Sequence, residues 1–159
     1  MALRNIFKDG EPVLRRRCHP VVRFDDRLHQ LLGDMADTMY DADGVGLAAP
    51  QVGILRRAVV IDVGEGIVEL LNPVITEQSE ETVCDQEGCL SFPGEYGMVP
   101  RPARVVCEYQ DRFGAPQRVE AEGLFARAIC HECDHLDGRV FKDIAERMID
   151  PEELGAEEE

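Results

Sequence analysis

Residues 131–138, HECDHLDG, limit the possible folds more than any other part of the sequence. The segment begins with the pattern H-E-x-x-H, and on a helix two histidines four positions apart lie on one face, about one turn from each other. Both imidazoles can then reach one metal ion. Glu132, about 100° further round the helix, can approach a water molecule at the same site. The segment therefore predicts a helix that carries a metal centre on one face.

A third protein ligand has to come from elsewhere in the chain. Two histidines fill only half of a tetrahedral shell, and a catalytic metal site usually has three protein ligands and one open position. On the expected helix, Cys130 and Cys133 point away from the face that carries His131 and His135. Cys89 is the best candidate, because it lies in a glycine-flanked segment that we expect to be a strand end.

Two alternatives remain open on the motifs alone. A metallopeptidase with the same H-E-x-x-H pattern would use a downstream His or Glu as its third ligand. A non-catalytic protein would instead pair the C-x-x-C spacing of Cys130 and Cys133 with Cys84 and Cys89 in a closed shell of four thiolates. Against the second alternative, this C-x-x-C pair falls within the expected helix and not in a tight turn.

The length and the charge of the chain narrow its class. A chain of 159 residues fits one domain, so we expect a single catalytic domain over 1–159, with a short acidic tail from about residue 148. The formal charge of -15 argues against direct binding to DNA. We find no signal peptide and no membrane-spanning run, so we expect a cytoplasmic protein with reduced cysteines. Of these, we expect Cys107, Cys130 and Cys133 in the core, and Cys18 and Cys84 at the surface.

Apolar residues at three- and four-residue steps predict a helix over 25–42. Residues 44–53 contain three glycines and a proline, which exclude a regular helix, and we expect a buried turn with Gln51 as its single polar side chain. The other expected elements are strands at 57–63 and 67–75, an acidic connection at 77–85, a hairpin of 103–110 and 116–122, and the helix at 123–137.

Three blocks now stand in order: GVGLAAPQVG at 44–53, EGCLS at 87–91 and HECDHLDG at 131–138. Together they resemble the peptide deformylase family, and the resemblance covers about residues 6–145. It implies an α+β fold of small, mostly antiparallel sheets packed around a central helix with the H-E-x-x-H motif. It also implies a metal-dependent hydrolase that removes the formyl group from the N-terminal formyl-methionine of newly made proteins and releases formate. The implied cofactor is one divalent ion, Fe²⁺ as the native metal, with Zn²⁺ or Ni²⁺ as substitutes.

The resemblance also implies roles for individual residues. Glu132 becomes the general acid and base, and Gln51 and the backbone N–H of Leu90 become the donors to the oxyanion. The implied metal ligands are Cys89, His131 and His135. The implied substrate-binding residues are Val45, Gly46, Glu87, Gly88, Leu124 and Ala128, of which Gly46 and Gly88 offer backbone hydrogen bonds.

Two features depart from the family pattern. Phe92 stands where smaller β-branched residues are common, and we expect it to reshape the rim of the site. The tail after Met148 is acidic, whereas some members carry a long basic helix there. Like charges repel, so this tail does not support even a transient association with ribosomal RNA. The expected partners are N-formyl-methionyl nascent peptides, with no membrane and no DNA.

Overall fold

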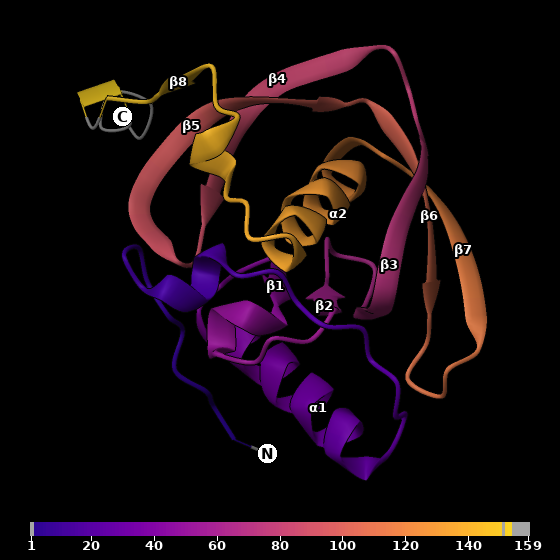
Figure 1. The fold of residues 1–159 in the computed structure, drawn as a ribbon. Helices are drawn as coiled ribbons and strands as arrows, with labels where there is room; N and C mark the ends of the chain where they lie inside the picture. The colour runs from indigo at the N-terminus through magenta and orange to yellow at the C-terminus, as the bar shows by residue number, and fades with distance from the viewer. Residues whose placement is uncertain (1, 151, 154–159) are drawn as a thin grey trace.

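The helix that carries the H-E-x-x-H pattern, α2 (Gly123–Leu136), lies at the centre of the molecule, with strands of two sheets around it (Figure 1). This computed structural model describes residues 2–150 and 152–153. The larger sheet has the order β1 (Gly46–Ala48), β2 (Ala58–Ile61), β3 (Val68–Gln78), β6 (Arg104–Gln110) and β7 (Pro116–Glu122). The smaller sheet has the order β4 (Thr82–Cys89), β5 (Phe92–Pro102) and β8 (Arg147–Met148). Neighbouring strands are antiparallel throughout. The predicted α+β fold around a central helix is therefore confirmed.

The other long helix, α1 (Asp26–Asp41), confirms the helix predicted over 25–42. The side chain of Asp25 accepts a hydrogen bond of 3.1 Å from the backbone N–H of Leu28, which satisfies a free donor at the helix start. The glycine-rich segment 44–53 forms β1 and a 3-10 helix, and Gln51 within it is 1% exposed, as predicted for a buried turn. The 3-10 helices are η1 (Pro12–Arg15), η2 (Ala49–Val52) and η3 (Phe141–Asp143).

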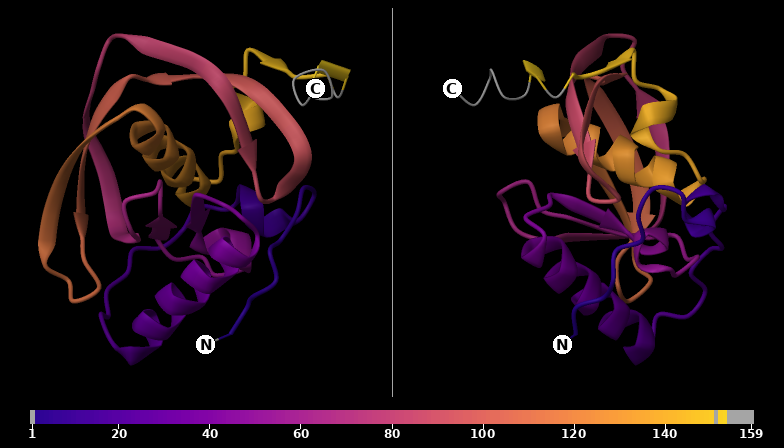
Figure 2. Two further views of the ribbon diagram at one scale, coloured as in Figure 1. Left: turned by 180° about the vertical axis from the view of Figure 1, so that it is seen from behind. Right: turned by 90° about the vertical axis from the view of Figure 1, so that its left-hand side faces the viewer.

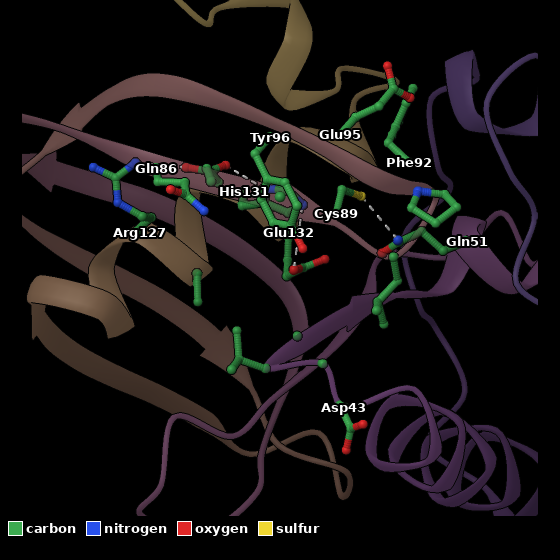
Figure 3. Close-up of a pocket in the computed structure, with 18 of the residues that line it drawn as sticks. Asp43, Gln51, Gln86, Cys89, Phe92, Glu95, Tyr96, Arg127, His131 and Glu132 are labelled. Atoms are coloured by element: carbon green, nitrogen blue, oxygen red, sulfur yellow. Dashed lines mark hydrogen bonds and ion pairs between the residues drawn. The ribbon is translucent and has the colours of Figure 1, made fainter. Parts of the chain in front are cut away.

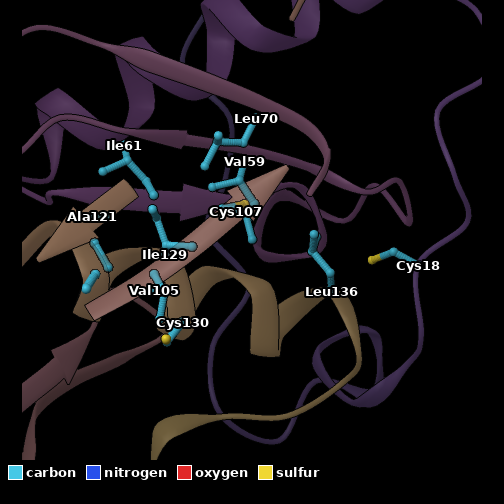
Figure 4. Packing of buried hydrophobic residues seen from close by; sticks show 13 residues of the cluster. Cys18, Val59, Ile61, Leu70, Val105, Cys107, Ala121, Ile129, Cys130 and Leu136 are labelled. Carbon is cyan, nitrogen blue, oxygen red and sulfur yellow. The ribbon is translucent and has the colours of Figure 1, made fainter. Parts of the chain in front are cut away.

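The short strand β2 separates two parts of the core. Successive side chains of a strand point to opposite faces, so Val59 and Ile61 pack towards α2 while Ala58 and Val60 pack towards α1. All four are fully buried, and Ile129 of α2 joins the first group (Figure 4). Burying each large side chain of this kind contributes about 1.5–3 kcal/mol. The two helices therefore lie on opposite faces of β1 and β2 (Figure 2). Packing against these strands holds α2 in place.

The segment 77–85 differs from the prediction of an acidic connection. β3 runs through residue 78 and β4 begins at residue 82, so the turn between them is much shorter. The strand passes Asn72 with a left-handed backbone (φ 51°), and this side chain hydrogen-bonds to Val21 and Gln110 at 2.7–2.9 Å. Residues 82–86 of β4 are exposed, while the strand pairs with β5 along its whole length. Pairing with the next strand has overridden the local preference of the polar sequence.

The segment that begins near residue 148 also starts as a strand. Arg147 and Met148 pair with β5, and the backbone N–H of Ile149 donates to the carbonyl oxygen of Tyr96 at 2.8 Å. Residues 151 and 154–159, which hold most of the expected acidic tail, lie outside the described residues.

The six cysteines are all free. Cys84 is exposed, and Cys107 and Cys130 are buried, as predicted. Cys18 was expected at the surface, but this prediction is wrong, because Cys18 is 4% exposed and its backbone N–H donates to the carbonyl of Leu136 at 2.8 Å. Contact with the end of α2 explains this burial. Within the described residues, no helix combines the length and the apolar character that a membrane crossing requires.

Candidate active site

A cavity of about 450 Å³ opens beside α2, between the loop that leads into β1 and the hairpin of β4 and β5 (Figure 3). It collects residues from three separate stretches of the chain, as the three sequence blocks predicted. The expected site residues that line it are Val45, Gly46, Gln51, Glu87, Gly88, Cys89, Leu90, Leu124, Ala128, His131 and Glu132. The remaining expected residue, His135, lies one helical turn beyond His131.

The three expected metal ligands converge on one point. One ligand atom each of Cys89, His131 and His135 lies within 4.8 Å of the others. The sulfur of Cys89 is 3.3 Å from Nε2 of His135, and Nδ1 of His131 is occupied by Glu87, which leaves Nε2 of His131 free. Two imidazole nitrogens and one thiolate suit a divalent transition metal, and three protein ligands is the number typical of catalytic sites. The donor set therefore fits the divalent ion on which the implied chemistry depends.

The alternative of a closed site with four thiolates does not fit this arrangement. Cys130 is buried in the core, and Cys133 packs against the same core from α2. Among the described residues, the only group of three or more candidate ligands is the one with Cys89. The C-x-x-C spacing of Cys130 and Cys133 therefore reflects packing and not a structural zinc site.

Glu132 points its carboxylate into the cavity. Its Oε1 is buried and has no hydrogen-bond partner among the described residues, while Oε2 is 4.0 Å from Nε2 of His131. Burial raises the pKa of Glu132 to about 7. A carboxyl group that titrates near neutral pH can both accept and return a proton. The backbone at Gly46 leaves no room for a side chain here, since a Cβ would lie 2.5 Å from Oε2 of Glu132.

A buried ionic network lies behind His131. Glu87 accepts a hydrogen bond of 2.5 Å from Nδ1 of His131, so its carboxylate orients this imidazole. Two guanidinium groups hold the carboxylate in turn: Arg101 at 2.6 and 3.2 Å and Arg127 at 2.8 Å. Arg101 also donates to Asp134 on α2 at 2.7 Å. The network ties α2 to both strands of the β4–β5 hairpin.

The network sets the protonation states of the groups around it. Burial raises the pKa of Glu87, but hydrogen bonds from His131 and Arg101 outweigh this and hold the pKa at about 2. Burial also acts on both histidines. Burial lowers the pKa of His135, and the charge of His131 lowers it further. Burial also acts to lower the pKa of His131, but the charge of Glu132 and the contacts with Cys89 and Glu87 together raise it. His135 is therefore neutral, as a metal ligand must be.

The two arginines of this network were not among the site residues predicted from the sequence. The position of Arg127 near His131 could have been predicted, because Arg127 lies four residues before His131 and so shares its helix face. No local sequence pattern predicts the role of Arg101, because it lies on β5 and reaches Glu87 only through the pairing of β4 with β5. Glu87 was expected as a pocket residue, and it does line the cavity, but its carboxylate is engaged by His131 and the arginines.

Gln51 has a defined orientation beside the cysteine. Its Oε1 accepts a hydrogen bond of 3.0 Å from the backbone N–H of Ala48, which leaves the amide Nε2 as the donor facing the site. Nε2 is 3.1 Å from Oγ of Ser91 and 3.5 Å from the sulfur of Cys89. An amide donor is thus held next to the candidate metal ligands.

The walls of the cavity are largely apolar. Val45 and Leu124 are 44% and 54% exposed and flank its mouth. Phe92, expected to reshape the rim, is only 3% exposed and packs edge-on against Phe141 at 5.6 Å between ring centroids. It therefore forms part of a packed wall. A mostly apolar cavity with a few convergent polar groups is typical of a site for a small apolar side chain.

Comparison with known proteins matches this geometry. The family model described as polypeptide deformylase matches residues 3–150. A peptide deformylase of Caldicellulosiruptor bescii is 58% identical over 154 residues, which are 97% of this chain and 92% of that protein. The crystal structure of peptide deformylase from Thermotoga maritima has a TM-score of 0.90 at 45% identity, covering 91% of this chain and 99% of that one.

A second solved structure, a peptide deformylase from Synechococcus elongatus in complex with actinonin, has a TM-score of 0.87 at 47% identity and covers 89% of this chain and 78% of that one. The similarity therefore extends over nearly the whole chain and includes the three sequence blocks. The chain belongs to the peptide deformylase family, the metal-dependent hydrolases that remove the N-formyl group from the formyl-methionine of new proteins.

Proposed function

We propose that Cys89, His131 and His135 hold the metal of this deformylase. The single observation that carries this assignment is the convergence of their three ligand atoms within 4.8 Å, beside a cavity of the size of a small ligand. The hydrogen bond from Nδ1 of His131 to Glu87 supports it, because metal-bound histidines usually donate their second nitrogen to a carboxylate or carbonyl.

The proposed mechanism divides the work among the residues around the metal. A divalent ion held there would supply a water molecule of lowered pKa, about 7, as the nucleophile. Glu132 accepts the proton of this water, and its unpartnered, buried Oε1 and its pKa of about 7 support that role. Gln51 Nε2 and the backbone N–H of Leu90 donate to the oxyanion that forms on the formyl group. Glu132 then returns the proton to the departing amine.

The methionine side chain is proposed to enter the apolar part of the cavity. Methionine is unbranched and flexible, so it fits an apolar wall of irregular shape. Gly46 and Gly88 offer backbone groups to the peptide, which is possible because neither has a side chain in the way. The proposed lining is Val45, Gly46, Glu87, Leu124, Ala128 and His131.

We further propose Fe²⁺ as the native metal, with Zn²⁺ or Ni²⁺ as substitutes. Protein reconstituted with Fe²⁺ without oxygen should release formate from formyl-Met-Ala-Ser and should leave Met-Ala-Ser intact. Air should inactivate the iron form, and replacement of the metal should restore it. Formate release coupled to metal analysis of the same sample measures this. An activity that is indifferent to air would assign another ion, and cleavage of the unformylated peptide would indicate a peptidase.

The role of Cys89 can be tested against a second thiol on the same strand. Cys89→Ser should lower the metal affinity or change the metal preference, because a thiolate favours softer ions than a hydroxyl does. The control is Cys84→Ser, which alters an exposed thiol of β4 outside the cavity. Metal stoichiometry after dialysis against a competing chelator is the measurement. Full occupancy in Cys89→Ser would remove Cys89 from the ligand set.

The partners follow from the activity. N-formyl-methionyl nascent peptides are the substrates, and we place the enzyme in the cytoplasm, where these chains are made. The net charge of -15 opposes a stable association with ribosomal RNA and with DNA, and we propose no membrane partner. We also propose that residues 1–159 form one catalytic domain, because the metal ligands come from β4 and α2 and the cavity needs both sheets.

A further inference from the structure

The ring of Tyr96 lies directly on the backbone of Gly88. The two residues are paired across β4 and β5, and a Cβ at Gly88 would be 2.7 Å from Cε1 and 2.8 Å from Cδ1 of Tyr96. Both residues line the cavity, and Figure 3 labels Tyr96 among the residues around it. The tyrosine thus covers the backbone to which the substrate peptide is proposed to bind.

The ring lies on the outward face of the hairpin. On β4, Glu87 points inward to His131, so the next residue, Gly88, faces the other way. On β5, Val99 and Arg101 are buried towards α2, whereas Tyr96 and Met98 alternate with them and are half-buried. The methionine pocket beside Glu87 and the ring of Tyr96 therefore lie on opposite faces of the same strand pair.

A substrate peptide that binds in an extended conformation beside Gly88 presents its successive side chains to opposite faces of the β4–β5 hairpin. When its first side chain enters the inward pocket, its second side chain points outward. The outward position next to Gly88 is the one that Tyr96 occupies. The hydroxyl of Tyr96 makes no hydrogen bond with any described residue, so the ring itself is the available contact surface.

We propose that Tyr96 is a specificity-determining residue that contacts the second residue of the substrate, the one after formyl-methionine, and favours an aromatic or large aliphatic side chain there. This inference rests on the proposed binding of the peptide at Gly88 and of methionine in the inward pocket. Contacts between aromatic side chains strengthen binding by about two- to ten-fold beyond their area burial. The preference should appear mainly in KM, because the ring is proposed to contact the second residue of the substrate and not its formyl group.

The test compares formyl-Met-Phe-Ser with formyl-Met-Ala-Ser. The wild type should prefer the Phe peptide in kcat/KM by about three- to ten-fold. Tyr96→Ala should reduce this ratio to within about two-fold of one. Tyr96→Phe should keep the wild-type ratio, because it retains the ring. Met98→Ala is the matched control, because Met98 lies on the same face of β5 outside the cavity and should not alter the ratio.

A binding measurement separates this inference from the proposed function. NMR titrations with N-acetyl-Met-Phe-Ser and N-acetyl-Met-Ala-Ser give the ratio of the two Kd values without turnover. They therefore test the preference even where a variant or the wild type releases no formate. Loss of the preference in Tyr96→Ala alone supports the role of the ring. An undiminished preference in Tyr96→Ala overturns it, and so does an equal loss in Met98→Ala.

Discussion

Replacing Glu132 by glutamine should lower formate release by about 10³-fold while the protein keeps its metal and its fold. The carboxylate is proposed to take a proton from water and to return it to the amine, and general acid–base catalysis of this kind contributes about 10²–10⁴-fold. Glutamine has nearly the same shape but cannot accept the proton. Since Glu132 is not one of the three converging ligands, the metal content should not change. The measurements are kcat for formyl-Met-Ala-Ser, metal stoichiometry and Tm.

Asp43→Asn is a control for this change, because Asp43 is another carboxylate that lines the cavity but lies at the exposed mouth. It should change kcat by less than about three-fold, as expected for a side chain away from the reacting atoms. Glu132→Ala should behave like Glu132→Gln. If either Glu132 variant retains more than about a tenth of the wild-type kcat at full metal occupancy, Glu132 is not the general acid and base.

Replacing Arg101 by leucine should lower the free energy of unfolding by about 3–5 kcal/mol, because it leaves the carboxylate of Glu87 buried without its bidentate partner. For a chain of this length the Tm should fall by roughly 10 °C. The affinity for the metal should also fall by about 10–100-fold, because Glu87 would no longer hold His131 rigidly. Thermal unfolding and chelator competition measure the two effects separately.

During acid titration, Arg101→Leu should have its unfolding midpoint at a higher pH than the wild type. In the wild type, the pKa of Glu87 is about 2 in the folded state, below its ordinary value of 4.5. Its contribution to stability is therefore complete above about pH 4.5 and is lost as the pH falls towards 2. Without Arg101 the pKa of Glu87 rises, so Arg101→Leu should lose stability at a higher pH than the wild type during acid titration.

The control is Arg118→Leu, which removes an exposed arginine whose ion pair with Glu120 is 3.3 Å long, with both side chains more than half exposed. Surface ion pairs of this kind contribute about 0–1 kcal/mol, so the Tm should hardly change. Equal shifts in Tm and metal affinity for the two arginine variants would contradict the role of Arg101.

The sequence by itself predicted which residues form the candidate site. The spacing of His131 and His135 on a helix, the glycine-flanked Cys89 and the buried Gln51 all depend on local pattern, and residues a few positions apart have fixed relations on a helix or a tight turn. The helix at 25–42 and the helix that carries the histidines were predictable for the same reason, since their apolar residues recur at helical spacing.

The tertiary structure decided what local pattern does not contain. The polar segment 82–86 became a strand only because β5 pairs with it, and Cys18 became buried only because the end of α2 lies against it. Arg101 reached Glu87, and Tyr96 came to lie on Gly88, through the register of the same hairpin. The energies of these contacts depend on burial and on the register of strand pairing, which the local pattern of residues does not specify.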